Sequence, residues 1–523
     1  MASPHLIYHE LLRATLPESR IGVFGWGTVA PRSPDIDAFA RNLAESSSWL
    51  APFEGFGPTN FLAGTPDFQF SRYKSWIDQR FPPRHYQTLV EKMDLPTQYA
   101  VGAFIQALGQ NPGLEQELTA LGTAAHVYVG TGIGNVDTLF HASLELFKAQ
   151  RRWDRFWSEP EHNSALRSAG EVCPQGDEDT ESAWRHEWMA RSPELSAYLA
   201  ELAAIEDVTI DGPNVDGAKL NAIREKEKRR TKIREKWQAP ESPWNVSANV
   251  IWNLHNTPAA QISILGHVHG LTFAPVAACS TFGVALKLAM DAIHRGEAKI
   301  VVVGATDPPP HPLIVGAFYT GRVLSAGNRV SLPLSRFRGT HVAGGAVVWI
   351  VGDLEYLRAK GFRALGMEPI AVGVSSDAHH IITPSAEGPP LAINQALSGA
   401  GASPEDIGTW DTHTTSTPGD FAEMSTLRSM LPDSVLVTAR KGTFGHGMSA
   451  GGGWELTAQF LGFERGALFP TPLSKEEFSL AISAIHSNVV FDAACPLPAG
   501  LAGKLSMGIG GINACVISRP LKD

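Results

Sequence analysis

The segment from Ala274 to Asp307 constrains the fold more than any other part of the chain. It reads APVAACSTFGVALKLAMDAIHRGEAKIVVVGATD, which predicts an apolar strand, an amphipathic helix and a second buried strand. Apolar residues recur between Val284 and Ile293 at helical spacing, and Gly296 is well placed to end the helix. Such a strand–helix–strand unit predicts an α/β fold with mostly parallel sheets.

The same alternation of buried strands and helices extends over most of the chain. Further strands or helices are predicted within segments 20–31, 97–110, 126–135, 341–353, 368–380, 433–447 and 503–518. The alternation occurs twice, with a break near Gly361. We therefore predict two halves, residues 18–360 and residues 361–523.

A charged, tryptophan-rich segment at about 148–244 interrupts the first half and shows no pattern of buried strands. We interpret it as a partly helical insertion. Its basic run REKEKRRTKIREK, Arg224–Lys236, carries interleaved glutamates and predicts one exposed helix with i,i+4 ion pairs. A solvated helix face is the simpler interpretation, and a docking patch for an acidic partner is the alternative.

Charge and cysteine content exclude several classes of protein. The 523 residues carry a net charge of −10, so nucleic acid is not an expected partner. The four cysteines lack the spacing of a zinc site, and disulfides are not expected in a chain of this length. The first residues do not resemble a signal peptide, and the apolar runs are too short to span a membrane. A cytoplasmic location is predicted.

Cys279 lies where the predicted strand of the opening segment meets the helix. The N–H groups and the dipole at a helix N-terminus favour an anion, so a thiol there is expected to ionise more easily and to be nucleophilic. A small buried apolar side chain is the competing interpretation, and the position of Cys279 alone does not separate the two. We interpret Cys173, Cys495 and Cys515 as structural.

Two histidine motifs favour the catalytic interpretation. In DTHTTSTPGDFAE, His413 is followed by hydroxyl groups and a Pro-Gly turn, which is typical of a loop at a strand end. In RKGTFGHGMSAGGGWE, which contains Lys441, His446 and Glu455, a strand runs into a glycine-rich turn and a helix of small residues. Each motif alone is a weak signal, but the two together with Cys279 form a specific set.

This set resembles the β-ketoacyl synthases of the thiolase superfamily, in the branch with a Cys-His-His active site. The motifs AACST, THTTSTPGDFAE, KGTFGHGMSAGGGWE and GIGGINA occur in the order found in that family. The resemblance covers roughly residues 20–147 and 245–518. It implies a thiolase fold, in which two pseudo-symmetric halves form a five-layered αβαβα core, with the insertion as an addition.

The resemblance also implies a reaction, a decarboxylative Claisen condensation. Cys279 would carry the acyl group as a thioester. His413 and His446, both neutral, would stabilise the enolate that a malonyl thioester leaves on losing CO₂. Lys441 and Glu455 match the charged pair that supports the second histidine in the family.

Other residues match the family's binding positions. The backbone N–H groups of Cys279 and Ile509 would form the oxyanion hole, and Thr415 and Thr417 would bind the phosphopantetheine arm. Ile509 stands where the family usually has a gating Phe, which leaves the choice of acyl chain open. The sequence also departs from the family at HVAGGAV, where many members carry an acidic residue between the glycines.

The family implies no metal and no bound cofactor. Its substrates are acyl and malonyl thioesters carried by an acyl carrier protein or coenzyme A, and a homodimer is expected. Three alternatives stay open: an initiating synthase that uses short acyl-CoA, a decarboxylase or thioesterase, and a non-catalytic partner subunit that shapes the tunnel.

Overall fold

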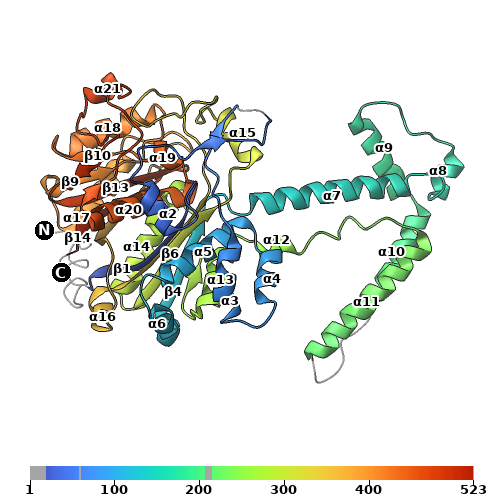
Figure 1. Cartoon of the computed structure of the whole chain (residues 1–523). Helices are drawn as coiled ribbons and strands as arrows, with labels where there is room; N and C mark the ends of the chain where they lie inside the picture. Colours follow the sequence, from blue (N-terminus) through green and yellow to red (C-terminus); the bar gives the residue numbers. More distant parts are fainter. Residues whose placement is uncertain (1–18, 58–59, 207–214, 522–523) are drawn as a thin grey trace, which may run out of the picture. The chain divides into compact units, whose positions relative to one another are not determined.

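The central helix of the Ala274–Asp307 segment is α14 (Thr281–His294), and Gly296 ends it with φ of +71°, as predicted. In the computed structural model, residues 19–57, 60–206 and 215–521 are described (Figure 1). The chain divides into two compact units. One holds the residues up to Val136 and from Ile251 onward, and the other holds Asp137–Val250. The start of the predicted first half, residue 18, lies outside the described residues.

Two five-stranded sheets form the framework of the first unit. The first sheet has the order β1-β7-β6-β4-β5, with β1 (Ile21–Val29), β4 (Ala125–Thr131), β5 (Thr272–Phe273), β6 (Ile300–Asp307) and β7 (Gly345–Asp353). The second has the order β8-β14-β13-β9-β10, with β8 (Met367–Ser376), β9 (Ile407–Asp411), β10 (Leu436–Thr438), β13 (Leu501–Gly508) and β14 (Ile512–Pro520).

The two sheets repeat one topology. In each, the strands taken in chain order lie side by side as first, fifth, fourth, second and third. The first two pairings of that row are antiparallel and the last two are parallel. The expectation of mostly parallel sheets holds for four strands of each sheet, whereas the fifth strand of each half runs opposite to both of its neighbours. Strands buried on both faces look alike in sequence whichever way they run.

Helices form three layers around the two sheets (Figure 1). The bounds are α5 (Leu95–Leu108), α13 (Thr257–Gly266), α17 (Gly388–Ala400), α18 (Gly419–Met430) and α20 (Met448–Arg465). Helices α5 and α13 contact the first sheet, α14 and α20 contact both sheets, and α17 contacts the second sheet. The result is the five-layered α/β arrangement with two similar halves that the resemblance implied. Because α20 is enclosed, its residues Met448–Gly462 are all buried.

Several predicted elements are confirmed, with shifted ends. Segment 20–31 contains β1, segment 97–110 contains most of α5, and segment 126–135 contains most of β4. The predicted strand before Cys279 is wrong at Ala274–Ala277, because β5 already ends at Phe273 and a 3-10 turn, Ala278–Ser280, follows. The break predicted near Gly361 falls between the last strand of the first sheet and the first strand of the second.

Shorter elements complete the first unit and its borders. They are β2 (Ala51–Pro52), β3 (Leu62–Ala63), β11 (Ala467–Leu468), β12 (Cys495–Pro496), α2 (Ile36–Asn42), α3 (Lys74–Asp78), α4 (His85–Lys92), α6 (Leu114–Leu121), α12 (Asn249–Trp252), α15 (Pro312–Thr320), α16 (Leu354–Ala359), α19 (Lys441–Phe444) and α21 (Leu480–Ser483). None of the helices in the described part of the chain is long and apolar enough to cross a membrane.

The second unit is helical and contains the charged segment 148–244. Its helices are α7 (Val136–Trp157), α8 (Ser164–Ala169), α9 (Glu178–Ala190), α10 (Pro193–Glu206) and α11 (Val215–Trp237). Trp153, Trp157 and Tyr198 belong to a small core of its own. The basic run lies on α11, where one i,i+4 pair joins Arg229 to Glu225. Other cations of α11 instead pair with Glu201 and Glu206 of α10.

Candidate active site

The chain topology brings two helix starts together. Cys279 ends the connection from the third strand of the first half, β5, to the central helix α14. His446 ends the equivalent connection from β10 to α20 in the second half. The turn that holds Cys279 contacts α20. The repeated fold therefore places the cysteine of one half beside a histidine of the other.

Cys279 lies in a tightly held turn. The preceding residue, Ala278, has φ of +48°, a left-handed conformation that is costly for a residue other than glycine. Thr281 Oγ1 stabilises the turn, since it accepts a hydrogen bond from Ala277 N at 2.9 Å and donates to Ala278 O at 2.7 Å. The Ser280 hydroxyl lies 2.7 Å from Ile512 O, which ties the turn to the second sheet.

His413 follows β9, and its backbone N–H and carbonyl are both hydrogen-bonded to charged side chains. Its backbone N–H donates to Glu423 Oε1 at 2.7 Å, and its carbonyl accepts from Lys441 Nζ at 2.6 Å. The same Nζ lies 3.4 Å from Nδ1 of the imidazole. Because an ammonium group only donates, Nδ1 acts as the acceptor and the ring proton is on Nε2.

His446 has the same tautomer for a different reason. Its Nδ1 accepts a hydrogen bond from the backbone N–H of Met448 at 3.1 Å. Nδ1 is therefore unprotonated, and a neutral ring carries its proton on Nε2. The backbone N–H of His446 also donates to His341 O at 2.7 Å, which fixes the glycine-rich turn.

Cys279, His413 and His446 converge in one buried site. The sulfur and one nitrogen of each ring all lie within 4.8 Å of one another, and the ring centroids of the two histidines are 5.4 Å apart. Burial, reinforced by the nearby Lys441, lowers the pKa of His413 well below its ordinary value and that of His446 to about 3. Both imidazoles are thus neutral at pH 7.

The expectation of an acidic thiol at Cys279 is wrong for the free protein. Burial raises the pKa of Cys279 to about 11, although the backbone N–H of Ile509 and the charge of Lys441 act in the opposite direction. The loss of water around the sulfur outweighs the hydrogen bond from Ile509 and the positive charge of Lys441. At pH 7 the resting group is therefore a thiol.

Ile509 lies in the turn between β13 and β14, and its N–H faces the Cys279 sulfur. The neighbouring Gly508 permits this approach, since a Cβ there would lie 2.8 Å from Ala277 O. Gly510 and Gly511 have φ of +92° and +72°, a left-handed conformation that favours glycine. The Ile509 side chain is 41% exposed.

A cavity of about 260 Å³ opens onto Cys279, His413 and His446. Thr415 and Thr417 both line it, and their hydroxyl groups are 3.0 Å apart. Asp420 holds this loop by accepting from the backbone N–H groups of Thr415 at 2.7 Å and Ser416 at 3.1 Å. Burial nevertheless raises the pKa of Asp420 to about 6.

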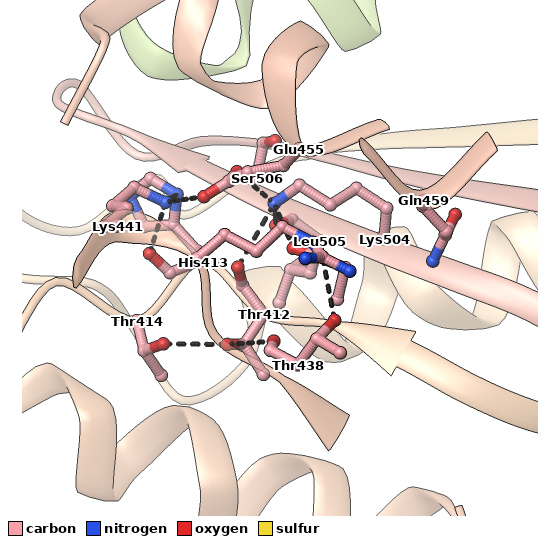
Figure 2. A network of polar contacts seen from close by, with 12 residues as sticks. Thr412, His413, Thr414, Thr438, Lys441, Glu455, Gln459, Lys504, Leu505 and Ser506 are labelled. Carbon is pink, nitrogen blue, oxygen red and sulfur yellow. Dashed lines mark hydrogen bonds and ion pairs between the residues drawn. The ribbon is translucent and has the colours of Figure 1, made fainter. Parts of the chain in front are cut away.

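Lys441 and Glu455 form the buried ion pair that the sequence motif suggested, with Nζ 2.7 Å from Oε1 (Figure 2). Burial opposes ionisation of Glu455, but Lys441 and a second lysine, Lys504, together hold its pKa below the ordinary value. Lys504 Nζ lies 2.7 Å from Glu455 Oε2.

Comparison with known proteins identifies the family. Family models described as "Beta-ketoacyl synthase, N-terminal domain" and "Beta-ketoacyl synthase, C-terminal domain" match residues 203–355 and 369–474. The chain is 30% identical to "3-oxoacyl-[acyl-carrier-protein] synthase 2" of Vibrio cholerae, over 84% of this chain and 85% of that protein. The protein of the same name from Rhizobium meliloti is also 30% identical, over 55% of this chain and 69% of that protein.

The chain belongs to the β-ketoacyl synthase family. Solved ketosynthases share its fold at low sequence identity. "The ishigamide ketosynthase/chain length factor" is 18% identical with a TM-score of 0.69, and covers 97% of this chain and 100% of that chain. A type II polyketide ketosynthase solved with its acyl-carrier protein is 16% identical with a TM-score of 0.66, at the same two coverages. The resemblance read from the sequence motifs is confirmed, and so is the thiolase fold.

Sequence reasoning missed three charged members of this β-ketoacyl synthase's site. Lys504, Asp411 and Arg440 are all buried beneath the Lys441–Glu455 pair. The available signal was Lys504, a charged residue in the middle of LAGKLSMG, which otherwise has the composition of a buried strand. Asp411 and Arg440 gave no such signal, since they adjoin histidine and lysine motifs of loop character.

Proposed function

We propose that this β-ketoacyl synthase condenses an acyl thioester, loaded on Cys279, with a malonyl thioester in fatty acid or polyketide-type biosynthesis. The observation that carries the proposal is the convergence of the Cys279 sulfur with two neutral imidazoles. Each imidazole keeps Nδ1 occupied as an acceptor and leaves Nε2–H as a donor.

In the first half-reaction, the Cys279 sulfur attacks the acyl thioester carbonyl. The carbonyl oxygen, as it becomes an oxyanion, accepts hydrogen bonds from the N–H groups of Cys279 and Ile509. When the tetrahedral intermediate collapses, the bond to the carrier sulfur breaks and the acyl group stays on Cys279. The thiol proton of Cys279 leaves with the carrier thiol, so charge is balanced.

In the second half-reaction, a malonyl thioester occupies the cavity beside the acylated cysteine. The bond to its carboxylate breaks, CO₂ departs and the electron pair forms an enolate. The two Nε2–H groups of His413 and His446 donate to the enolate oxygen, which is the arrangement that favours negative charge in a water-poor site. The enolate carbon then forms a bond to the acyl carbon, the bond between that carbon and the Cys279 sulfur breaks, and the released thiolate takes a proton from water as the 3-ketoacyl product leaves.

Substrate binding follows from the residues that line the cavity. Thr415 and Thr417 offer hydroxyl groups to the amides of a phosphopantetheine arm, and Ile509 gates the path to Cys279. We propose an acyl carrier protein as the donor partner, since the similar proteins are named for that substrate. We also propose that the protein is a homodimer and is located in the cytoplasm.

No cofactor or metal takes part in the proposed chemistry. Cys279, His413 and His446 are close enough to ligate a metal ion. However, Lys441 Nζ lies 3.4 Å from Nδ1 of His413, and this positive charge disfavours a cation in the site.

The test is intact-mass detection of acyl groups on the protein, followed by assay of 3-ketoacyl product and CO₂ after adding malonyl thioester. A panel of acyl-carrier-protein and coenzyme A thioesters also distinguishes the proposed enzyme from an initiating synthase, which would accept short acyl-CoA alone. Cys279→Ala should abolish acylation and condensation. Equal product from wild type and Cys279→Ala would refute the proposal. CO₂ or free acid without ketoacyl product would indicate a decarboxylase or thioesterase, and absence of any acylation would indicate a non-catalytic subunit.

A further inference from the structure

We propose that Lys504 is a positioning residue for the condensation step, which holds Glu455 and the His413 loop in their working geometry. This inference rests on the proposed function, and it assigns a role to a residue outside the family's motifs. Lys504 lies on β13, and Figure 2 shows its side chain reaching toward Glu455.

The Lys504 side chain is 1% exposed, so its charge must be satisfied inside the protein. Its Nζ lies 2.7 Å from Glu455 Oε2, 2.5 Å from Leu505 O and 3.3 Å from Thr412 O. The two carbonyl oxygens accept hydrogen bonds from Nζ, and Glu455 Oε2 forms an ion pair with it. The position of Nζ is therefore fixed from three directions.

Each acceptor of Lys504 is joined to a part of the site. Thr412 O belongs to the peptide bond that leads into His413. Glu455 accepts from Lys441 through its other oxygen, and Lys441 in turn sets the tautomer of His413. Leu505 continues along β13 toward Ile509. Lys504 thus connects the loop that holds His413, the Lys441–Glu455 ion pair and strand β13, which leads to the turn at Ile509.

Of the two buried carboxylates near Lys504, Glu455 is the closer. Asp411 Oδ1 lies 4.0 Å from Lys504 Nζ, while the other oxygen, Oδ2, accepts from Arg440 Nε and Thr438 Oγ1, each at 2.8 Å. Burial lowers the pKa of His413, and the charges of Lys441 and Lys504 lower it further. Two lysines sharing Glu455 therefore help to keep His413 neutral while they hold it in place.

A purely structural role makes a different prediction. The lysine stem packs inside the protein, so a substitution could lower stability while turnover per folded molecule stays the same. A positioning role instead predicts lower condensation turnover, with little change in how fast Cys279 is acylated or how tightly malonyl thioester binds. The two roles are therefore separated by measuring the half-reactions one at a time.

The main variant is Lys504→Met, which keeps the stem and removes the charge and the donors. We expect condensation kcat to fall about 10- to 100-fold, by analogy with residues that orient metal ligands through hydrogen bonds. The rate of Cys279 acylation and the KM for malonyl thioester should stay within about threefold. The matched control is Lys299→Met, which removes a lysine paired with Asp353 at 2.8 Å on the rim of the first sheet. This control should keep full turnover.

Two further measurements keep the test decisive. In Lys504→Ala, added methylammonium should restore condensation in a saturable way, which a general loss of packing would not allow. If Lys504→Met does not fold, Lys504→Gln, which keeps two N–H donors without the charge, is measured in its place with the same expectations. A folded variant with wild-type condensation kcat would overturn the proposal.

Histidine side-chain ¹⁵N spectra give a readout that needs no substrate. The His413 resonances, assigned with His413→Asn, should shift in Lys504→Met and stay unchanged in Lys299→Met. If wild type reacts with no thioester, the proposed function fails, yet these spectra still decide the role of Lys504. Unchanged His413 resonances in Lys504→Met would overturn the positioning role even if the protein proves to be an active synthase.

Discussion

Nζ of Lys441 lies 3.4 Å from Nδ1 of His413, and this contact decides which imidazole nitrogen carries the proton. The ammonium group cannot accept a hydrogen bond, so Nδ1 must be the acceptor and Nε2 the donor. The carbonyl of His413 is bound by the same Nζ at 2.6 Å, so the ring and its backbone share one anchor. The family resemblance assigned Lys441 and Glu455 to the support of His446. Lys441 also acts directly on His413.

Replacing Lys441 by methionine should separate the two half-reactions. Without Nζ, His413 can take either tautomer, and Glu455 keeps only Lys504 as a cationic partner. We expect condensation to fall about 100-fold, comparable to loss of one oxyanion donor, while acylation of Cys279 changes by less than about fivefold. Rapid-quench assay of acylation and steady-state assay of condensation check this. The control is Lys287→Met, which removes a partly exposed i,i+4 pair with Asp291. Equal loss in both half-reactions would contradict the assignment.

Alkylation of Cys279 should depend steeply on pH. With a pKa of about 11, the thiolate fraction rises about tenfold per pH unit from pH 7 to pH 10, and so should the rate of reaction with iodoacetamide. Mass spectrometry of the Cys279 peptide gives this rate, and the partly exposed Cys495 serves as the internal reference. A rate that levels off below pH 8 would show that the free protein holds a thiolate.

Much of the fold could be read from the sequence, because buried strands and amphipathic helices have distinct periods. The Ala274–Asp307 segment is the clearest case, since its helix α14, the terminal Gly296 and the following strand β6 all appear in the structure, while the strand before the helix ends earlier than predicted. The convergence of Cys279, His413 and His446 followed from motif order within the family. Spacing alone would not have shown it, since the histidines lie on different connections of the second half.

Other features depend on three-dimensional surroundings that no local pattern contains. The prediction of an acidic Cys279 thiol considered the helix N-terminus but not the loss of water around the sulfur. Burial has the largest effect on the pKa of Cys279 and raises it. The direction of β7 was missed because β7 is buried on both faces, as is its antiparallel neighbour β6, which pairs in parallel with β4. Lys504 on β13 pairs with Glu455 on α20, and the two residues are 49 positions apart in the chain. No local sequence pattern links them.

Replacing Ala278 by glycine should not destabilise the protein. Ala278 has φ of +48°, where glycine is preferred over alanine by about 1 kcal/mol, so the free energy of unfolding is expected to rise by about that amount. Ala289→Gly in the buried interior of α14 is the matched control and should lower it by about 1 kcal/mol. Urea unfolding of both variants checks the sign. Equal destabilisation by the two substitutions would show that the turn before Cys279 is not strained.

His341 should make the protein less stable in mild acid. Burial lowers the pKa of His341 to about 4, and its ring is held between Ser331 N at 2.8 Å and Leu62 O at 3.1 Å. An unfolded histidine has a pKa near 6.5, so below that pH the unfolded chain takes up a proton that the folded chain refuses. The stability from this group is present above pH 6.5 and is lost as the pH falls toward 4.

This loss amounts to about 2 kcal/mol at pH 5 for one such histidine. His341→Gln, which can still accept from Ser331 and donate to Leu62, should therefore lose about 2 kcal/mol less than wild type between pH 7 and pH 5. Urea unfolding at the two pH values measures the difference. His141→Gln, at a side chain that is 65% exposed, is the control and should leave the pH dependence as in wild type. If His341→Gln and wild type have the same dependence, the ring takes up its proton in the folded protein as readily as in the unfolded chain.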